Sequence, residues 1–251
     1  MRLEIEFIIN KTKKINFNYN YYITSAIYNL ISEHNKDFSE MLHNEGYKIG
    51  NKRFKLFVYS RLMPQKFTID GSNMIIEKGI TRLYVNSPIK EFINSLGNSL
   101  IKRGSMKIGK EEFQINNIYL KDSVKFNHET KFITLSPIVV TTGEERNGGI
   151  RSRTVHITED KFIENIKNNL IKKYFLVYGK LPDNMSIDIK FNEEYIKNNR
   201  RGHLINFKGI SIKGYIAPFV MRCSDDIKKV AVDCGIGENN SIGMGYIMEK
   251  K

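Results

Sequence analysis

The sequence predicts an α+β fold in which each half of the chain repeats the order strand, helix, two strands, helix and strand. Segments whose apolar residues alternate with polar ones, as in half-buried strands, are separated in each half by two segments with apolar residues at helical spacing. The chain has 251 residues, which is enough for two small domains. Two consecutive βαββαβ patterns predict two tandem ferredoxin-like (RRM-like) domains.

The N-terminal domain is expected over residues 1–122. Its first strand is predicted over residues 2–9, because Leu3, Ile5 and Phe7 alternate with charged residues. The elements expected after this strand are a helix over residues 21–32, a short helix over 37–44, strands over 54–62, near 75 and over 83–85, a helix that Ser87 and Pro88 begin, and a strand over 113–120.

The C-terminal domain is expected over residues 123–251, after a link near residues 121–130. The boundary depends on the repeated pattern of elements, since charge does not distinguish the two halves. The elements expected in this domain are a strand over 132–140, a helix over 159–174 with Thr158 as its cap, a strand over 185–191, a long hairpin over 204–221, a helix over 225–234 that Ser224 caps and Gly235 ends, and a strand over 242–248.

The distribution of charge predicts a surface that contacts a polyanion. Lys and Arg number 40 against 27 Asp and Glu, which gives a net charge of +13. Three windows, residues 46–69, 146–158 and 195–224, contain no Asp or Glu, although a solvated surface usually mixes both signs. The residues in these windows that are expected to contact phosphates are Lys48, Lys52, Arg53, Arg146, Arg151, Arg153, Lys197, Arg200, Arg201, His203 and Lys208.

Other features exclude several classes of protein. Cys223 and Cys234 are the two cysteines and form no CxxC-type pair, which argues against a disulfide framework and a zinc knuckle. Acidic residues interrupt the N-terminal segment, and the longest uncharged run, residues 15–32, is polar, so neither a signal peptide nor a membrane span is expected. No pair of histidines has metal-binding spacing, so no metal or other cofactor is expected. These features favour a cytoplasmic protein.

A glycine-rich segment near the end of the chain is the sharpest local motif. Gly235, Gly237, Gly243 and Gly245 permit positive φ angles and close approach of another backbone. A mononucleotide loop is disfavoured, because no Gly-Lys-Ser/Thr follows and because the segment is predicted to run from a helix into a strand. The alternatives are a loop whose amides contact an RNA backbone and a tight structural turn.

Several segments resemble, in the same order, segments of one protein family. They are residues 21–22 with 27–29, residues 42–44 and 55–57, the Leu-Ser-Pro-Ile run within 134–140, and the glycine-rich segment. On these segments the chain resembles, over nearly its whole length, the CRISPR-associated endoribonucleases of the RAMP superfamily, which process precursor CRISPR RNA. The resemblance implies a tandem ferredoxin-like fold and metal-independent cleavage of the CRISPR repeat. In that reaction the ribose 2′-hydroxyl attacks the adjacent phosphate and leaves a 2′,3′-cyclic phosphate and a 5′-hydroxyl.

The resemblance also implies catalytic roles for Tyr28, His43 and Lys55, the positions that match a Tyr-His-Lys set in some relatives. Helical phase places Tyr28 and His43 away from the buried faces of their helices. An imidazole can accept and return a proton near neutral pH, and a lysine can stabilise charge on phosphate. Tyr28 is expected either to donate to the leaving oxygen or to position the ribose. His34 is the main rival base.

A second function is compatible with the same fold and charge. The chain is then a non-catalytic RNA-binding RAMP subunit of a CRISPR effector complex, which has no need of the Tyr28, His43 and Lys55 set. In both interpretations the partner is CRISPR repeat RNA. Neither interpretation decides between a monomer and a homodimer.

Overall fold

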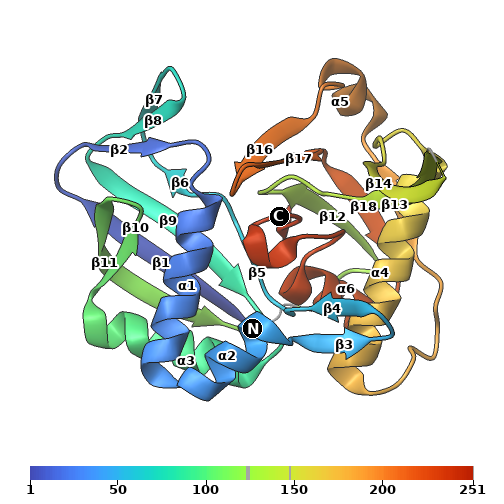
Figure 1. Cartoon of the computed structure of the whole chain (residues 1–251), viewed down its shortest axis with the longest axis horizontal. Coiled ribbons are helices and arrows are strands. Elements are labelled where there is room, and N and C mark those ends of the chain that lie inside the picture. Colours follow the sequence, from blue (N-terminus) through green and yellow to red (C-terminus); the bar gives the residue numbers. More distant parts are fainter. Residues whose placement is uncertain (123–124, 147, 251) are drawn as a thin grey trace.

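The structure, a computed structural model, describes residues 1–122, 125–146 and 148–250. Two antiparallel sheets lie side by side, one built from the first half of the chain and one from the second (Figure 1). Two long helices accompany each sheet. Of the helices described, none combines the length and the apolar character that a transmembrane span requires.

The first sheet has the strand order β10-β11-β1-β9-β5, with neighbouring strands antiparallel. Its elements are β1 (Arg2–Ile9), α1 (Asn20–His34), β5 (Val58–Tyr59), β9 (Gly79–Asn86), α3 (Lys90–Arg103), β10 (Ser105–Ile108) and β11 (Glu111–Lys121). The four strands of the βαββαβ unit are β1, β5, β9 and β11 in chain order. Across the sheet they lie in the order fourth, first, third and second, and β10 extends the edge beside β11.

The second sheet repeats this arrangement, with the order β15-β18-β12-β19. Its elements are β12 (Glu129–Thr134), α4 (Asp160–Tyr178), β15 (Asp188–Phe191), β18 (Phe219–Arg222), α6 (Asp225–Cys234) and β19 (Ile247–Glu249). All three pairings are antiparallel. The predicted fold of two tandem ferredoxin-like units is confirmed.

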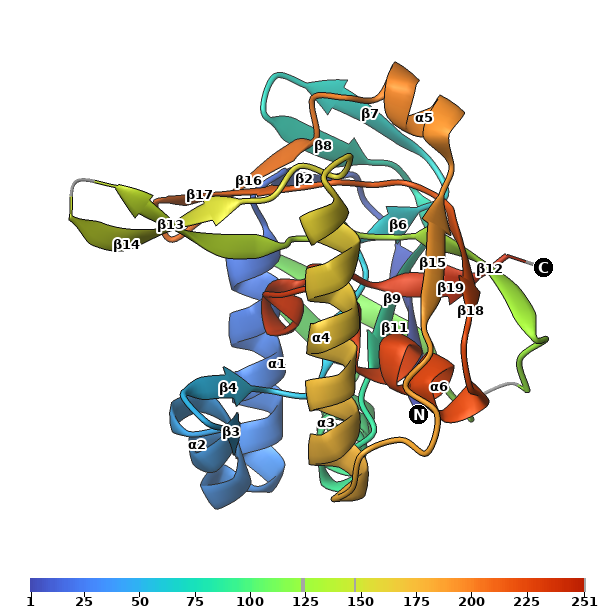
Figure 2. The ribbon, with the colours of Figure 1, turned by 90° about the vertical axis from the view of Figure 1, so that its right-hand side faces the viewer.

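Short hairpins and helices are added to these two units. They are β2 (Lys13–Asn16), α2 (Lys36–Asn44), β3 (Tyr47–Ile49), β4 (Lys52–Phe54), β6 (Met63–Pro64), β7 (Phe67–Asp70), β8 (Asn73–Ile76), β13 (Thr141–Arg146), β14 (Gly149–Thr154), α5 (Glu193–Asn198), β16 (His203–Phe207), β17 (Ile210–Gly214) and the 3₁₀ turn Asn240–Ile242. The β13–β14 hairpin projects from the body of the molecule (Figure 2). The sequence pattern did not predict this hairpin, because its strands carry few apolar residues.

Each unit has its own hydrophobic core. Helix α1 buries Ile23, Ile27 and Leu30 on one face, as the helical spacing predicts. Phe54 and Leu56 come from the first half of the chain but are buried in the core of the second. The β3–β4 hairpin and the segment after it thus reach across to α4, which brings Lys55 between the two units.

Two predicted helix caps are wrong. Helix α3 begins at Lys90, and the Ser87 hydroxyl instead donates to the Leu56 carbonyl at 2.8 Å. Helix α4 begins at Asp160 without a side-chain cap from Thr158. The hydroxyl of Ser87 bonds to a residue that is distant in the sequence. Helix α4 begins slightly further along the chain than the predicted cap requires.

Several predicted strands are shorter than expected, among them those over 132–140 and 185–191, which end at Thr134 and begin at Asp188. The hairpin predicted over 204–221 ends at Gly214, because the residues from Phe219 join the second sheet instead. The last strand begins at Ile247 and not at 242, since the glycine-rich segment occupies the residues before it. The predicted strand over 54–62 retains ladder pairing only at Val58–Tyr59 and, in β4, at Phe54.

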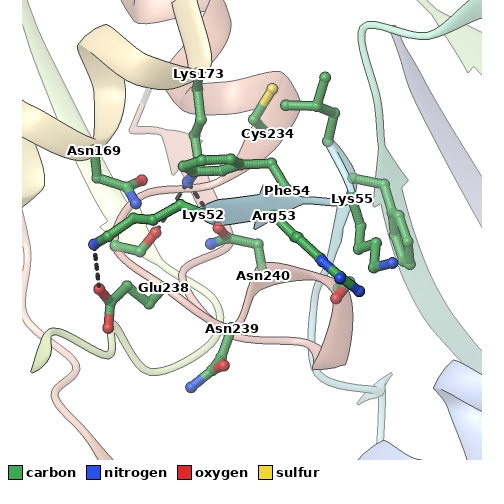
Figure 3. A pocket seen from close by; sticks show the side chains of 14 residues that line it. Lys52, Arg53, Phe54, Lys55, Asn169, Lys173, Cys234, Glu238, Asn239 and Asn240 are labelled. Atoms are coloured by element: carbon green, nitrogen blue, oxygen red, sulfur yellow. Dashed lines mark hydrogen bonds and ion pairs between the residues drawn. The ribbon is translucent and has the colours of Figure 1, made fainter. Parts of the chain in front are cut away.

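The glycine-rich segment, residues 235–245, lies between the two units. The Lys173 ammonium of α4 donates to the carbonyls of Gly235 and Gly237 and to Asn240 Oδ1, at 2.7–2.9 Å (Figure 3). Asn240 in turn donates from Nδ2 to the carbonyls of Ile236 and Met244. Side-chain donors of the second unit, Lys173 and Asn240, therefore hold the backbone of the segment in place.

Helix α1 of the first unit holds the outer side of the same segment. Asn20 Nδ2 donates to the Ile242 carbonyl at 2.9 Å, and the Thr24 hydroxyl donates to the Ser241 carbonyl at 3.3 Å. Asn20 and Thr24 lie one helical turn apart, on the side of α1 that faces the second unit. The segment thus ties α1 to α4.

The protein's own backbone requires glycine at these positions. Gly245 has φ +72°, and a Cβ there would lie 1.9 Å from the Ile236 carbonyl oxygen. Gly243 has φ +82°, and a Cβ there would lie 2.4 Å from the Tyr59 ring. Both the conformation and the available space therefore exclude larger residues.

We predict that Gly245→Ala destabilises the chain by about 2–5 kcal/mol, because a backbone clash adds to the cost of a left-handed alanine. The matched control is Gly209→Ala, which has φ +82° but no heavy atom within 4 Å of the added Cβ. That substitution should cost only about 1–2 kcal/mol. Chemical denaturation measures both losses, and equal losses would show that the close packing is unimportant.

Candidate active site

A groove of about 450 Å³ runs beside α1 and brings together residues from both halves of the chain. Helix α1 contributes a polar stripe at helical spacing, which consists of Tyr21, Ser25, Tyr28, Asn29 and Ser32. The other walls are formed by α2, by Lys55, by the glycine-rich segment and by the tip of the β16–β17 hairpin. We call this cavity the α1 groove.

The predicted catalytic residues Tyr28, His43 and Lys55 all line the α1 groove. They come from α1, α2 and the segment after β4, so only the tertiary fold brings them together. His34 ends α1 at an exposed position and is not among the residues that line the groove. This geometry favours His43 over His34 as the histidine of the site.

Tyr28 and His43 are in direct ring contact. Their ring centroids lie 5.1 Å apart with an edge-to-face angle of 85°. Tyr28 also packs on the buried Phe57 ring at 5.9 Å. Burial raises the pKa of Tyr28 far above its ordinary value, so its hydroxyl stays protonated and can donate a proton or hydrogen bond.

His43 is exposed to the groove, and its neighbour orients its ring. Nδ1 of His43 lies 3.0 Å from Asn44 Oδ1, which can only accept a hydrogen bond. The tautomer with its proton on Nδ1 satisfies this contact, and in that tautomer of the neutral ring Nε2 holds the lone pair. An imidazole in this state can accept a proton at Nε2.

Lys55 holds the end of α2. Its ammonium donates to the carbonyls of Leu42 and His43, the latter at 2.7 Å. Burial, together with the positive charge of Arg53, lowers the pKa of Lys55 below its ordinary value. Two of its three N–H donors are used within the protein, which leaves one for a ligand.

A second cavity of about 360 Å³ lies on the other side of Lys55. Lys55 and Ser241 line both cavities, and Lys52, Arg53 and the buried Lys173 line the second (Figure 3). Lys173 was not identified from the sequence. The available signal was its position, three residues after Leu170 on the apolar face of α4, where a charged residue needs buried partners.

The predicted phosphate-binding residues divide into two sets. Lys197, Arg200, Arg201, His203 and Lys208 lie in α5, in the loop after it and on the β16–β17 hairpin, all at exposed positions. Within the described part of the chain, the four lysines and arginines of this set form no ion pair. They are the predicted residues most available to a polyanion.

The second set is partly engaged within the protein. Lys48 lies 3.2 Å from Glu45, and Arg53 donates to the Asn44 carbonyl. Arg153 forms a two-pronged ion pair with Glu159 at 2.8–2.9 Å, which lowers the pKa of that carboxyl to about 2. Lys52 lies 3.9 Å from Glu238, Arg151 is exposed on β14, and the side chain of Arg146 lies outside the described residues.

The four glycines of the motif are buried, and the contacts described above account for them without RNA. The amides of Gly243 and Gly245 donate to the carbonyls of Asn240 and Pro137. Direct contact of the glycines with RNA stays a prediction. The segment reaches the α1 groove through Ser241 and Ile242.

Comparison with known proteins places both halves of the chain in one family. Residues 14–119 match the family model described as CRISPR-associated protein Cas6, N-terminal, and residues 120–248 match CRISPR associated protein Cas6, C-terminal. The chain is 32% identical to CRISPR-associated endoribonuclease Cas6 1 of Methanocaldococcus jannaschii, over 99% of this chain and 92% of that protein. It is 31% identical to CRISPR-associated endoribonuclease Cas6 of Pyrococcus furiosus, over 93% and 83% of the two chains.

Solved structures agree with these matches. A structure described as CRISPR associated protein Cas6 has a TM-score of 0.80 at 30% identity and covers 100% of this chain and 99% of its own. A structure described as a RAMP protein binding different RNA substrates has a TM-score of 0.84 at 21% identity, with full coverage of both chains. The second likeness concerns the fold alone.

The two sets of basic residues predict different salt dependence of RNA binding. Replacing Arg200 and Arg201 with Ala should flatten the slope of log affinity against log salt by about 0.7 for each phosphate that the protein then fails to neutralise. Arg153→Ala should leave the slope nearly unchanged, because Glu159 already neutralises that guanidinium. Fluorescence anisotropy over a range of salt concentrations measures the slopes, and an equal change in both variants would contradict this division.

Proposed function

The chain belongs to the Cas6 family of CRISPR-associated proteins and is an endoribonuclease that processes precursor CRISPR RNA; we propose that it cleaves the repeat RNA in the α1 groove by attack of a ribose 2′-hydroxyl. The observation that supports this site is the convergence of Tyr28, His43 and Lys55 from three separate elements on one cavity. The proposed chemistry needs a base, a donor to the leaving oxygen and a cation near the phosphate.

In the proposed reaction His43 Nε2 takes the proton from the 2′-hydroxyl. The 2′-oxygen then attacks the adjacent phosphorus, the bond from phosphorus to the 5′-oxygen breaks, and the products are a 2′,3′-cyclic phosphate and a 5′-hydroxyl. Tyr28 donates a proton to the leaving 5′-oxygen, since burial keeps its hydroxyl protonated. The proton gained by His43 balances the proton lost by Tyr28.

Lys55 has two roles in this proposal. Its bonds to the carbonyls of Leu42 and His43 hold the backbone of the histidine in place. Its remaining N–H stabilises the negative charge that grows on the phosphate oxygens. A half-buried lysine that is bonded to two carbonyls is already oriented, so the reaction does not have to order it.

A non-catalytic RNA-binding subunit is the second candidate. It would need the exposed basic residues near α5 and the β16–β17 hairpin but not the ring contact between Tyr28 and His43. A cleavage assay with His43 variants separates the two functions. Assembly with other proteins of an effector complex is a separate proposal, which co-purification tests.

We predict that His43→Ala lowers the cleavage rate by roughly 10²–10⁴-fold, the usual effect of removing a positioned acid or base. Binding of the repeat RNA should change little, because one imidazole contributes little to a contact dominated by phosphate charge. Single-turnover cleavage and binding by anisotropy measure the two effects. His34→Ala is the matched control and should cleave at the wild-type rate.

Two further results would overturn the mechanism. Cleavage should persist in EDTA, because the nucleophile is the RNA's own hydroxyl. A repeat RNA with 2′-deoxyribose at the scissile nucleotide should bind but remain intact. If EDTA stops the reaction, or if the deoxy substrate is cut, the proposed chemistry is wrong. If only His34→Ala is inactive, the histidine assignment is wrong.

A pH prediction follows from the electrostatic effect of Arg53 on Lys55, which adds to the effect of burial. Arg53 lowers the pKa of Lys55, so Arg53→Gln should raise that pKa and keep Lys55 charged to higher pH. The alkaline limb of the single-turnover rate at saturating RNA should therefore move to higher pH. Arg201→Gln removes the same charge from a distant position and should leave the limb in place. An unmoved limb in Arg53→Gln would show that Lys55 charge is not required.

A further inference from the structure

Three side chains form a solvent-accessible cluster at the end of the α1 groove nearest the β16–β17 hairpin. The Tyr21 ring lies 5.8 Å from the Phe207 ring in an edge-to-face arrangement, and the Lys208 ammonium lies 4.8 Å from the centre of the Tyr21 ring. All three line the groove that also contains Tyr28 and His43. We call Tyr21, Phe207 and Lys208 the Tyr21 platform.

The hairpin holds its side of the platform in place at a conformational cost. Lys208 and Gly209 form the turn with φ +53° and +82°, and the left-handed region is unfavourable for a lysine. Asn206 stabilises the turn by accepting from the Gly209 amide at 2.9 Å. The Asn206 amide donates to Asn18 Oδ1 at 2.8 Å, just before α1, so the hairpin is tied to the helix that carries Tyr21.

The chemistry of the platform suits a nucleobase with its phosphate. Tyr21 is 37% exposed and Lys208 is exposed, although an aromatic ring in a monomer is usually more buried. Unpaired bases stack on aromatic rings, and a lysine beside the ring can meet the phosphate that such a base brings. Lys208 has a flexible stem, so its ammonium can leave the ring face when a base arrives.

The position of the Tyr21 platform along α1 gives its distance from the proposed reacting bond. Tyr21 precedes Tyr28 by two helical turns on the same face of α1, which corresponds to about 10 Å along the helix. We propose that the Tyr21 platform stacks an unpaired nucleobase of the repeat RNA within three nucleotides of the scissile phosphate, with Lys208 on the phosphate of that nucleotide. This inference rests on the proposed function, because the α1 groove defines where the scissile phosphate lies.

The test combines a protein substitution with a change in the RNA. The probe is the repeat RNA of the source genome with 2′-deoxyribose at the scissile nucleotide, made intact or with one abasic site at each of the three nucleotides on either side. Tyr21→Leu removes the ring while keeping apolar volume. Tyr119→Leu is the matched control, since Tyr119 of β11 is 43% exposed, has the Lys121 ammonium over its ring as Tyr21 has Lys208, and does not line the groove, whereas the Tyr22 ring contacts Tyr21 itself.

We expect Tyr21→Leu to weaken binding of intact RNA by roughly 5- to 100-fold, the range for losing one base stacked on an aromatic ring. One abasic site should weaken wild-type binding by a similar factor and should cost little more in Tyr21→Leu. Such coupling, confined to one nucleotide, is the result expected for a ring and a base in contact. Tyr119→Leu should show no coupling with any abasic site.

Two results would overturn the inference. If Tyr21→Leu weakens binding of every RNA by the same factor, the ring only holds the hairpin. If it changes no affinity, the platform does not bind RNA. Failure of the proposed function is distinguishable: an active His43→Ala variant, together with coupling at Tyr21, would remove the catalytic assignment and keep the platform.

Discussion

The arrangement of the two units depends on one buried ammonium. Lys173 donates to three oxygens of the glycine-rich segment. Burial lowers the pKa of Lys173 to about 8, whereas its three acceptors favour the charged form. The segment that it holds also accepts hydrogen bonds from Asn20 and Thr24 of α1. Lys173 of α4 therefore holds in place the glycine-rich segment, which forms one wall of the α1 groove.

Lys55 likewise links the two units, on the side of the α1 groove where His43 lies. It lies between the two cavities because Phe54 and Leu56, its neighbours in the chain, are buried in the core of the second unit. From that position its ammonium reaches back to the last carbonyls of α2 and holds the backbone of His43. The histidine is carried by the first unit, but its position depends on packing in both.

The spacing of apolar residues along the chain predicted the order of helices and strands. It did not predict the long-range contacts that build the site. The two βαββαβ orders and the exposed position of His43 follow from periodicity, which depends only on neighbouring residues. Tyr28, expected on the outward side of its helix, instead packs against the buried Phe57 ring. The Arg153 pair with Glu159, the partner of Ser87 and the role of Lys173 depend on distant segments or on loops of irregular shape. Alternation could not identify the β13–β14 hairpin, because both of its faces are largely polar.

A glycine motif does not by itself indicate contact with a ligand, as the glycines of this segment show. Glycine is required at Gly243 and Gly245 because a ring and a carbonyl occupy the space that a side chain would need. The same tight path turns the segment so that Ser241 and Ile242, and not the glycines, face the α1 groove. Packing inside the protein is therefore a sufficient reason for the glycine pattern. Its consequence for catalysis is indirect: the glycines let the segment pass between α1 and α4, and that passage forms one wall of the site that holds Tyr28 and His43.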